Sequence, residues 1–165
     1  MPVVSNTSPI LNLAVIGRLS LLHDQFGEAL IPNEVLDELR IQENLPGSHE
    51  MRKALKEGWL IIQEVTDQSL VRVLQRELDI GEAAAIALAV QVKVDWILLD
   101  EKEGRKIAKS LGLQVAGILG ILLRARREGK LQSMQKAMDQ LRDMAGFHIG
   151  AELYDDLMRK SGESK

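Results

Sequence analysis

Polar residues follow two predicted strands of the chain at the point where each strand ends. Asp100 and Glu101 come directly after the apolar run WILL, and Asn6 stands in the stretch VVSNTSP, after two valines and a serine. Ligands of open parallel sheets bind at the carboxyl ends of the strands. These oxygen-bearing side chains are therefore candidates for a metal or substrate site.

Two further carboxylates come from helices that follow strands. Glu38 lies on a predicted helix over residues 34–41, and Glu82 lies in the first turn of the Ala-rich helix GEAAAIALAVQ. Crowded carboxylates repel one another, and a divalent cation between them keeps them ionised at neutral pH. With no cysteine and only three scattered histidines, oxygen ligands for Mg²⁺ or Mn²⁺ are favoured. Such ions activate water and neutralise phosphate charge, so phosphodiester hydrolysis is the matching chemistry.

Each acid also has a purely structural interpretation. Glu82 is typical of an acid in the first turn of a helix, where its charge complements the helix dipole. Glu38 is typical of an ordinary exposed helical glutamate. Asp100 has the character of a cap for the helix that follows it. On residue type and spacing alone, both interpretations stay open.

Smaller polar and basic groups stand near the same positions. Ser8 followed by Pro9 predicts a helix cap with proline at the first helical position, with a phosphate or water contact as the alternative for Ser8 or Thr7. Arg105 follows Asp100 on the next helix. It is expected either to contact substrate phosphate or to pair with Asp100 and orient it.

The elements that position these residues alternate along the chain. Short apolar runs predict strands at residues 3–4, 29–31, 59–65, 96–99 and 114–116, with helices between them. This order predicts one α/β domain over residues 1–165, with three α/β/α layers around a short parallel sheet. Residues 161–165 are expected to form a loose tail.

Composition narrows the function classes only in part. The absence of cysteine favours a reducing compartment, so a cytoplasmic location is expected, and no apolar run reaches the roughly 18 residues of a membrane span. The net charge of −3 neither indicates nor excludes a nucleic-acid partner. Aromatic residues are 3% of the chain, so base stacking is not expected to dominate recognition.

Five segments in order resemble a known family. They are VVSNTSPILNLAVIGRLSLL, IPNEVLDEL, DIGEAAAIALA, ILLDEKEGRKIAKSLGLQVAGILGILLRAR and GFHIGAEL. From about Val3 to Glu163 the chain resembles prokaryotic PIN-like proteins, relatives of the PIN-domain ribonucleases and VapC-type toxins. The resemblance implies a Mg²⁺- or Mn²⁺-dependent endoribonuclease, RNA as substrate, a small antitoxin as partner and a homodimer.

The acidic positions of the family map onto Asn6, Glu38, Glu82 and either Asp100 or Glu101. The first of these is usually aspartate, and Glu82 stands where aspartate is more common. Asparagine offers a carbonyl oxygen but no charge, so metal affinity is expected to fall. The alternative is therefore a catalytically weak or inactive PIN-fold protein that binds nucleic acid or regulates. A third possibility, a domain for a small phosphorylated ligand, is disfavoured because no complete Gly-rich loop follows the first strand.

Overall fold

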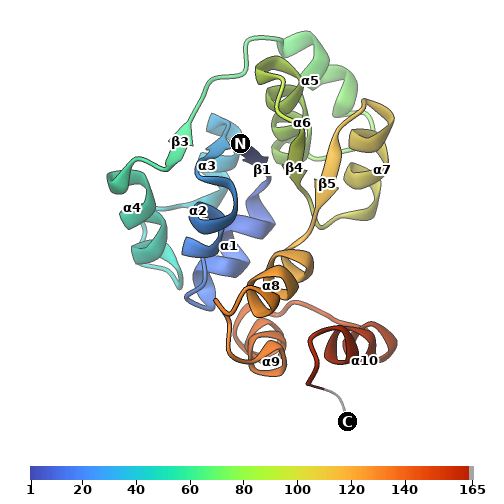
Figure 1. Cartoon of the computed structure of the whole chain (residues 1–165). Coiled ribbons are helices and arrows are strands. Elements are labelled where there is room, and N and C mark those ends of the chain that lie inside the picture. The colour runs from blue at the N-terminus through green and yellow to red at the C-terminus, as the bar shows by residue number, and fades with distance from the viewer. Residues whose placement is uncertain (164–165) are drawn as a thin grey trace.

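A five-stranded parallel sheet forms the centre of the computed structural model, which describes residues 1–163. The strands are β1 (Val3–Ser5), β2 (Ala29–Ile31), β3 (Leu60–Ile62), β4 (Trp96–Leu98) and β5 (Gln114–Ala116). They lie in the order β3-β2-β1-β4-β5, and every neighbouring pair is parallel (Figure 1). The predicted short parallel sheet is confirmed.

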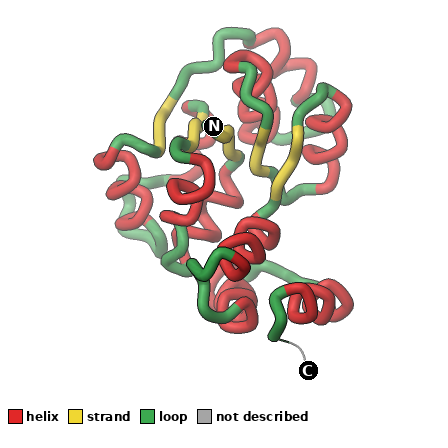
Figure 2. The backbone as a smooth tube through the Cα atoms, viewed as in Figure 1, coloured by secondary structure: helices red, strands yellow, loops and turns green. Residues whose placement is uncertain are grey.

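Helices separate the strands along the chain and flank the sheet (Figure 2). They are α1 (Thr7–Val15), α2 (Ser20–Phe26), α3 (Asn33–Leu39), α4 (Ser48–Glu57), α5 (Gln68–Leu74), α6 (Ile80–Val92), α7 (Lys102–Ser110), α8 (Ile118–Arg127), α9 (Met134–Ala145) and α10 (Ala151–Lys160). The expected α/β architecture, with the sheet as its middle layer, is therefore confirmed. None of the helices in residues 1–163 combines the length and the apolar character needed to cross a bilayer.

The central helix α6 explains the unbroken apolar run of its sequence. All nine residues from Gly81 to Ala89 are buried, and the helix packs on both β1 and β4. Alanine has the highest intrinsic helix propensity, and its small side chain lets the helix lie close to the sheet. The start of α6 is therefore held at the centre of the fold.

The strand order changes direction at β1, which pairs with β2 on one side and β4 on the other. Ser5 pairs in register with Leu98, and the backbone N–H of Asn6 donates to the carbonyl oxygen of Leu98 at 3.1 Å. The segments after β1 and β4 thus leave the same edge side by side. Such a switch point is where open α/β sheets bind ligands.

The first helix begins earlier than its sequence suggests. Asn6 is the N-cap residue of α1, so Ser8 lies inside the first turn, and the prediction of Ser8 as the cap is wrong. Pro9 is tolerated there because the first N–H groups of a helix have no intrahelical acceptor. The hydrogen bond from Asn6 to β4 fixes where the strand ends and therefore where the helix begins.

Glu163, the last residue that the structure describes, is tied to the start of α9. Glu163 accepts a hydrogen bond from the backbone N–H of Met134 at 2.6 Å, and its carboxylate pairs with Arg126 at 3.0 Å. The expectation of a loose tail is therefore wrong for residues 161–163. Residues 164–165 lie outside the described part of the chain.

Candidate functional site

Buried oxygen atoms without hydrogen-bond partners gather at the carboxyl edge of the sheet. They are Asn6 Oδ1, Glu82 Oε2 and Asp100 Oδ2, and the hydroxyl of Thr7 beside them also makes no hydrogen bond of ordinary geometry. Within residues 1–163 these are all the buried side-chain polar atoms that lack a partner. Because buried polar groups are normally paired, their concentration in one place indicates a site that a ligand completes.

Asn6 is held in place by its backbone rather than by its side chain. The residue is 5% exposed, and its amide makes no capping bond to α1. The amide oxygen is thus presented at the end of β1 with its acceptor capacity unused.

Glu82 occupies the third position of α6, where its carboxylate is buried. Its backbone N–H donates to Asp79 Oδ1 at 2.8 Å, and a Cβ placed on Gly104 would lie 2.6 Å from Glu82 Oε2. Glycine at 104 therefore allows α7 to pass directly over the carboxylate. Burial, followed by the negative charges of Asp79 and Glu101, raises the pKa of Glu82 to about 7.

Asp79 is a residue of this region that the sequence analysis missed. It caps α6, and its charge raises the pKa values of both Glu82 and Glu38. Asp79 and Glu82 stand three residues apart before an apolar run, which is the capping-box pattern and the signal that reveals the cap. The structural and the site interpretations of Glu82 therefore coexist, since the capping residue leaves Oε2 free.

Glu38 reaches from α3 to the start of α6. Its Oε1 lies so close to Gly81 that any side chain at position 81 would displace the Glu38 carboxylate. Glu38 is exposed as a residue, but partial desolvation of its carboxylate and the charge of Asp79 raise its pKa, while the Thr7 hydroxyl and the Gly81 N–H act in the opposite direction. Glu38 is thus placed against the start of α6, close to the segment after β1.

Asp100 joins the end of β4 to the start of α8. Its Oδ1 accepts a hydrogen bond from the Ile118 N–H at 3.2 Å, and Oδ2 stays free. The N-cap residue of α7 is Glu101, so Asp100 does not cap the helix that follows it. Burial raises the pKa of Asp100, and the charge of exposed Glu101 raises it further. The hydrogen bond from the Ile118 N–H and the charge of Arg105 lower this pKa, but by less than burial raises it.

Arg105 approaches Asp100 without a direct ion pair. A Cβ on Gly117 would lie 2.9 Å from Asp100 Oδ1 and 3.0 Å from Arg105 Nη1, so both side chains border this glycine. In the described part of the chain, no carboxylate lies within 4.0 Å of the Arg105 guanidinium. Its N–H groups therefore remain available to an anion.

Ser8 is half-buried in the first turn of α1.

The predicted metal ligands lie along one edge, but they are not a preformed metal centre. Across residues 1–163, no three acidic, histidine or cysteine side chains are grouped closely enough to hold an ion. Electrostatic coupling nevertheless connects the acids: Asp79 acts on Glu38 and Glu82, and Glu101 acts on Glu82 and Asp100. Unpartnered carboxylate and amide oxygens are the donors that Mg²⁺ and Mn²⁺ accept. The donor set fits a hard divalent cation.

Comparison with protein families adds to this geometry. A family model described as DUF3368, PIN domain, matches residues 2–163. The chain belongs to this PIN-domain family. Searches of curated proteins and of solved structures found no match. The resemblance seen in the sequence is confirmed, and the amide oxygen of Asn6 lies among the unpartnered oxygens of the edge.

Proposed function

We propose that this PIN domain is a Mg²⁺- or Mn²⁺-dependent endoribonuclease that hydrolyses phosphodiester bonds in RNA. The observation that carries the proposal is the set of buried, unpartnered oxygens of Asn6, Glu82 and Asp100 at the switch point of the sheet. Family membership supports the same function, because PIN domains are typically nucleases.

Each residue of the edge has a role in this proposal. Asn6, Glu38, Glu82 and Asp100 would hold the cation, which when bound would supply an activated water and neutralise phosphate charge. Glu101, exposed beside them, accepts the proton of the attacking water.

Two residues bind the substrate phosphate. The unpaired guanidinium of Arg105 binds its oxygens, because a planar fork of N–H donors matches phosphate geometry. The hydroxyl of Ser8 donates a further hydrogen bond to the same phosphate.

The test is cleavage of single-stranded RNA in the presence of Mn²⁺ or Mg²⁺. EDTA and a Glu38→Gln/Asp100→Asn double variant should abolish cleavage. Glu57→Gln serves as the matched control, since exposed Glu57 ends α4 just before β3, at the opposite edge of the sheet. Cleavage that survives both EDTA and the double variant would refute the proposal. The absence of cleavage at every metal concentration would refute it as well.

The biological role follows from the same proposal. We propose a cytoplasmic toxin that acts as a homodimer and is inhibited by a small antitoxin protein. Expression of the chain should then arrest growth, and co-expression of a short neighbouring gene should restore it. Growth arrest that persists in the Glu38→Gln/Asp100→Asn variant would show that toxicity does not come from RNA cleavage.

A second function is favoured by one observation, the neutral amide of Asn6 where nucleases of the family carry a carboxylate. If its missing charge leaves the cation too weakly bound, the chain is a catalytically weak or inactive PIN-fold protein that binds nucleic acid. Asn6→Asp separates the two functions. Activity and Mn²⁺ binding that appear only in this variant identify a degenerate nuclease, whereas zero for both in either protein favours the scaffold.

A further inference from the structure

A large hollow opens beside the carboxyl edge and shares residues with it. It has a volume of about 850 Å³ and lies between β5, α8, α10 and the end of α2. Asp100, Arg105 and Gly117 line one end, so the hollow is continuous with the candidate site. This volume falls within the roughly 300–1,000 Å³ typical of small-molecule sites.

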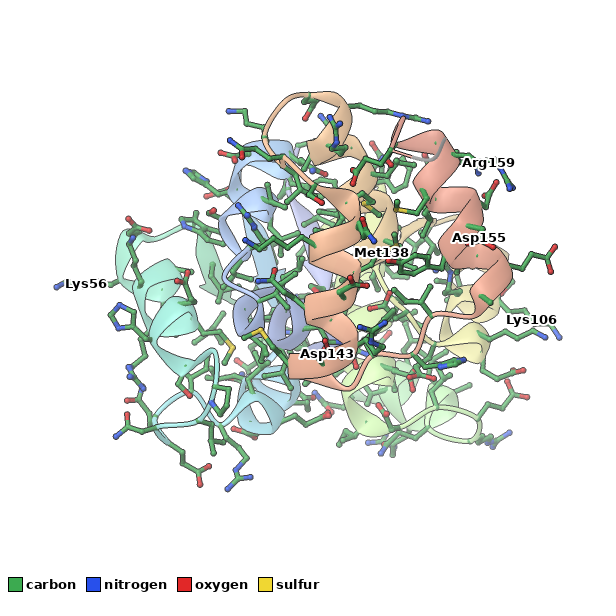
Figure 3. All side chains as sticks on the ribbon, turned by 90° about the horizontal axis from the view of Figure 1, so that it is seen from below. Lys56, Lys106, Met138, Asp143, Asp155 and Arg159 are labelled. Atoms are coloured by element: carbon green, nitrogen blue, oxygen red, sulfur yellow. The ribbon has the colours of Figure 1, made fainter. Side chains whose placement is uncertain are left out.

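The helix α10 forms the outer wall of the hollow. Leu153, Leu157 and Lys160 line it, at spacings of four and three residues that place them on one helix face. Asp155 and Arg159 lie on the other face and project outward (Figure 3). The face turned to the hollow is thus apolar along most of its length and ends in a cation.

Aromatic side chains are concentrated in this hollow. The chain has only five Phe, Trp and Tyr residues, and three of them, Phe26, Trp96 and Phe147, line it, together with His148. Each of the three is half-buried and lines the hollow. A low aromatic content therefore does not exclude a stacking surface, because most of it is gathered at one place.

Positive charge also borders the hollow. Its lining includes three cationic side chains, Arg105, Arg124 and Lys160, and two acidic ones, Asp95 and Asp100. Arg124 pairs with Glu128 and Lys160 with Asp156, whereas Arg105, at the end nearest the site, has no such pair among the described residues. A ligand with an aromatic part and a phosphate matches this combination of apolar wall and free guanidinium.

We propose that the hollow binds a nucleobase and its ribose from the RNA chain, next to the phosphate held at Arg105. The inference rests on the proposed RNA substrate and adds a subsite to it. Stacking on aromatic side chains is tolerant of base identity, so the subsite contributes affinity and register rather than strict sequence choice.

Gly120 offers a way to close the subsite without touching the candidate site. It lies in α8, lines the hollow and is exposed, and a Cβ placed on it meets nothing within 4 Å. Gly120→Phe therefore fills the hollow, while Gly120→Ala leaves it open and is the matched control. Leu153→Phe fills the hollow from α10, in case the first variant fails to fold.

Trp96 supplies a direct readout of base binding. In a Trp59→Phe background it is the single tryptophan of the chain. AMP should quench its fluorescence and ribose 5-phosphate should not, because only the former carries a base. Gly120→Phe should abolish the quenching and raise the KM for single-stranded RNA about tenfold, whereas Gly120→Ala should do neither.

The outcomes separate this inference from the proposed function. If the wild type cleaves RNA and folded Gly120→Phe and Leu153→Phe cleave it with the same KM, the subsite is refuted and the nuclease stands. That result is also expected if a protein segment occupies the hollow. If RNA quenches Trp96 but is never cleaved, the nuclease is refuted and the subsite stands. Folding of each variant is checked by circular dichroism and thermal melting.

Discussion

Replacement of Glu82 by glutamine should stabilise the metal-free protein, although it removes a proposed metal ligand. The pKa of Glu82 is raised from 4.5 to about 7, chiefly by burial and then by Asp79 and Glu101. Its ionised form is therefore less favourable in the folded chain than in the unfolded one. Stability is lost as the pH rises between these two values, because the folded state then binds more protons than the unfolded state.

The expected magnitude follows from the shift. At full strength, a rise from 4.5 to about 7 corresponds to ~3 kcal/mol. Glu82 is 6% exposed, but exposed Glu101 shows that solvent reaches this edge of the sheet, and solvent screening reduces the effect to ~1–2 kcal/mol. For a domain of this size, that corresponds to roughly 3–6 °C in Tm.

Urea unfolding in EDTA at pH 5 and pH 8 measures the effect. Glu82→Gln should exceed the wild type in stability at pH 8 and match it more closely at pH 5, while Glu57→Gln should follow the wild type at both. Added Mn²⁺ should stabilise the wild type at pH 8 and the Glu82→Gln variant much less. An identical pH dependence of wild type and Glu82→Gln would refute the reasoning.

Three further perturbations test the site and its support. Asp79→Asn keeps a capping side chain but removes its charge, so the pKa of Glu82, followed by carboxyl NMR, should fall part of the way from about 7 toward 4.5, because burial remains. An unmoved midpoint would contradict the contribution assigned to Asp79. Gly104→Ala should displace the Glu82 carboxylate and lower Mn²⁺ affinity in calorimetry about tenfold, and unchanged affinity would exclude Glu82 Oε2 as a ligand. Glu163→Ala removes hydrogen bonds to α9 and the ion pair with Arg126, and should lower the free energy of unfolding in urea by ~1–3 kcal/mol with no change in RNA binding. A change near zero would support the original expectation of a loose tail.

The sequence predicted the sheet well because its signals are local. The bounds of β2 and β5 were predicted as observed, since each is a short run ended by a proline or a glycine. The placement of Asp100 and Asn6 at the same edge of the sheet followed from the expectation of parallel strands, since each residue follows the end of a strand.

The missed features depend on contacts between distant segments. Ser8-Pro9 is a good local cap signal, yet the hydrogen bond between Asn6 and β4 makes the helix start two residues earlier in the chain, at Thr7. The anchoring of Glu163 depends on the start of α9, 29 residues earlier in the chain. Asp79 was accessible from the capping pattern, but its effect on both Glu38 and Glu82 required the packing of α3 against α6.

Gly81, Gly104 and Gly117 differ in kind from the glycines of the turns. Eight glycines have positive φ and are needed for their backbone conformation, whereas these three do not, and each lies against a site acid: Glu38, Glu82 or Asp100. Glycine is required at these three positions because a side chain there would collide with the neighbouring acid. Alanine at a turn glycine should therefore lower stability, while alanine at one of these three should change the ligand geometry of a protein that still folds. The chain thus separates the glycines that shape its backbone from those that make room for its chemistry.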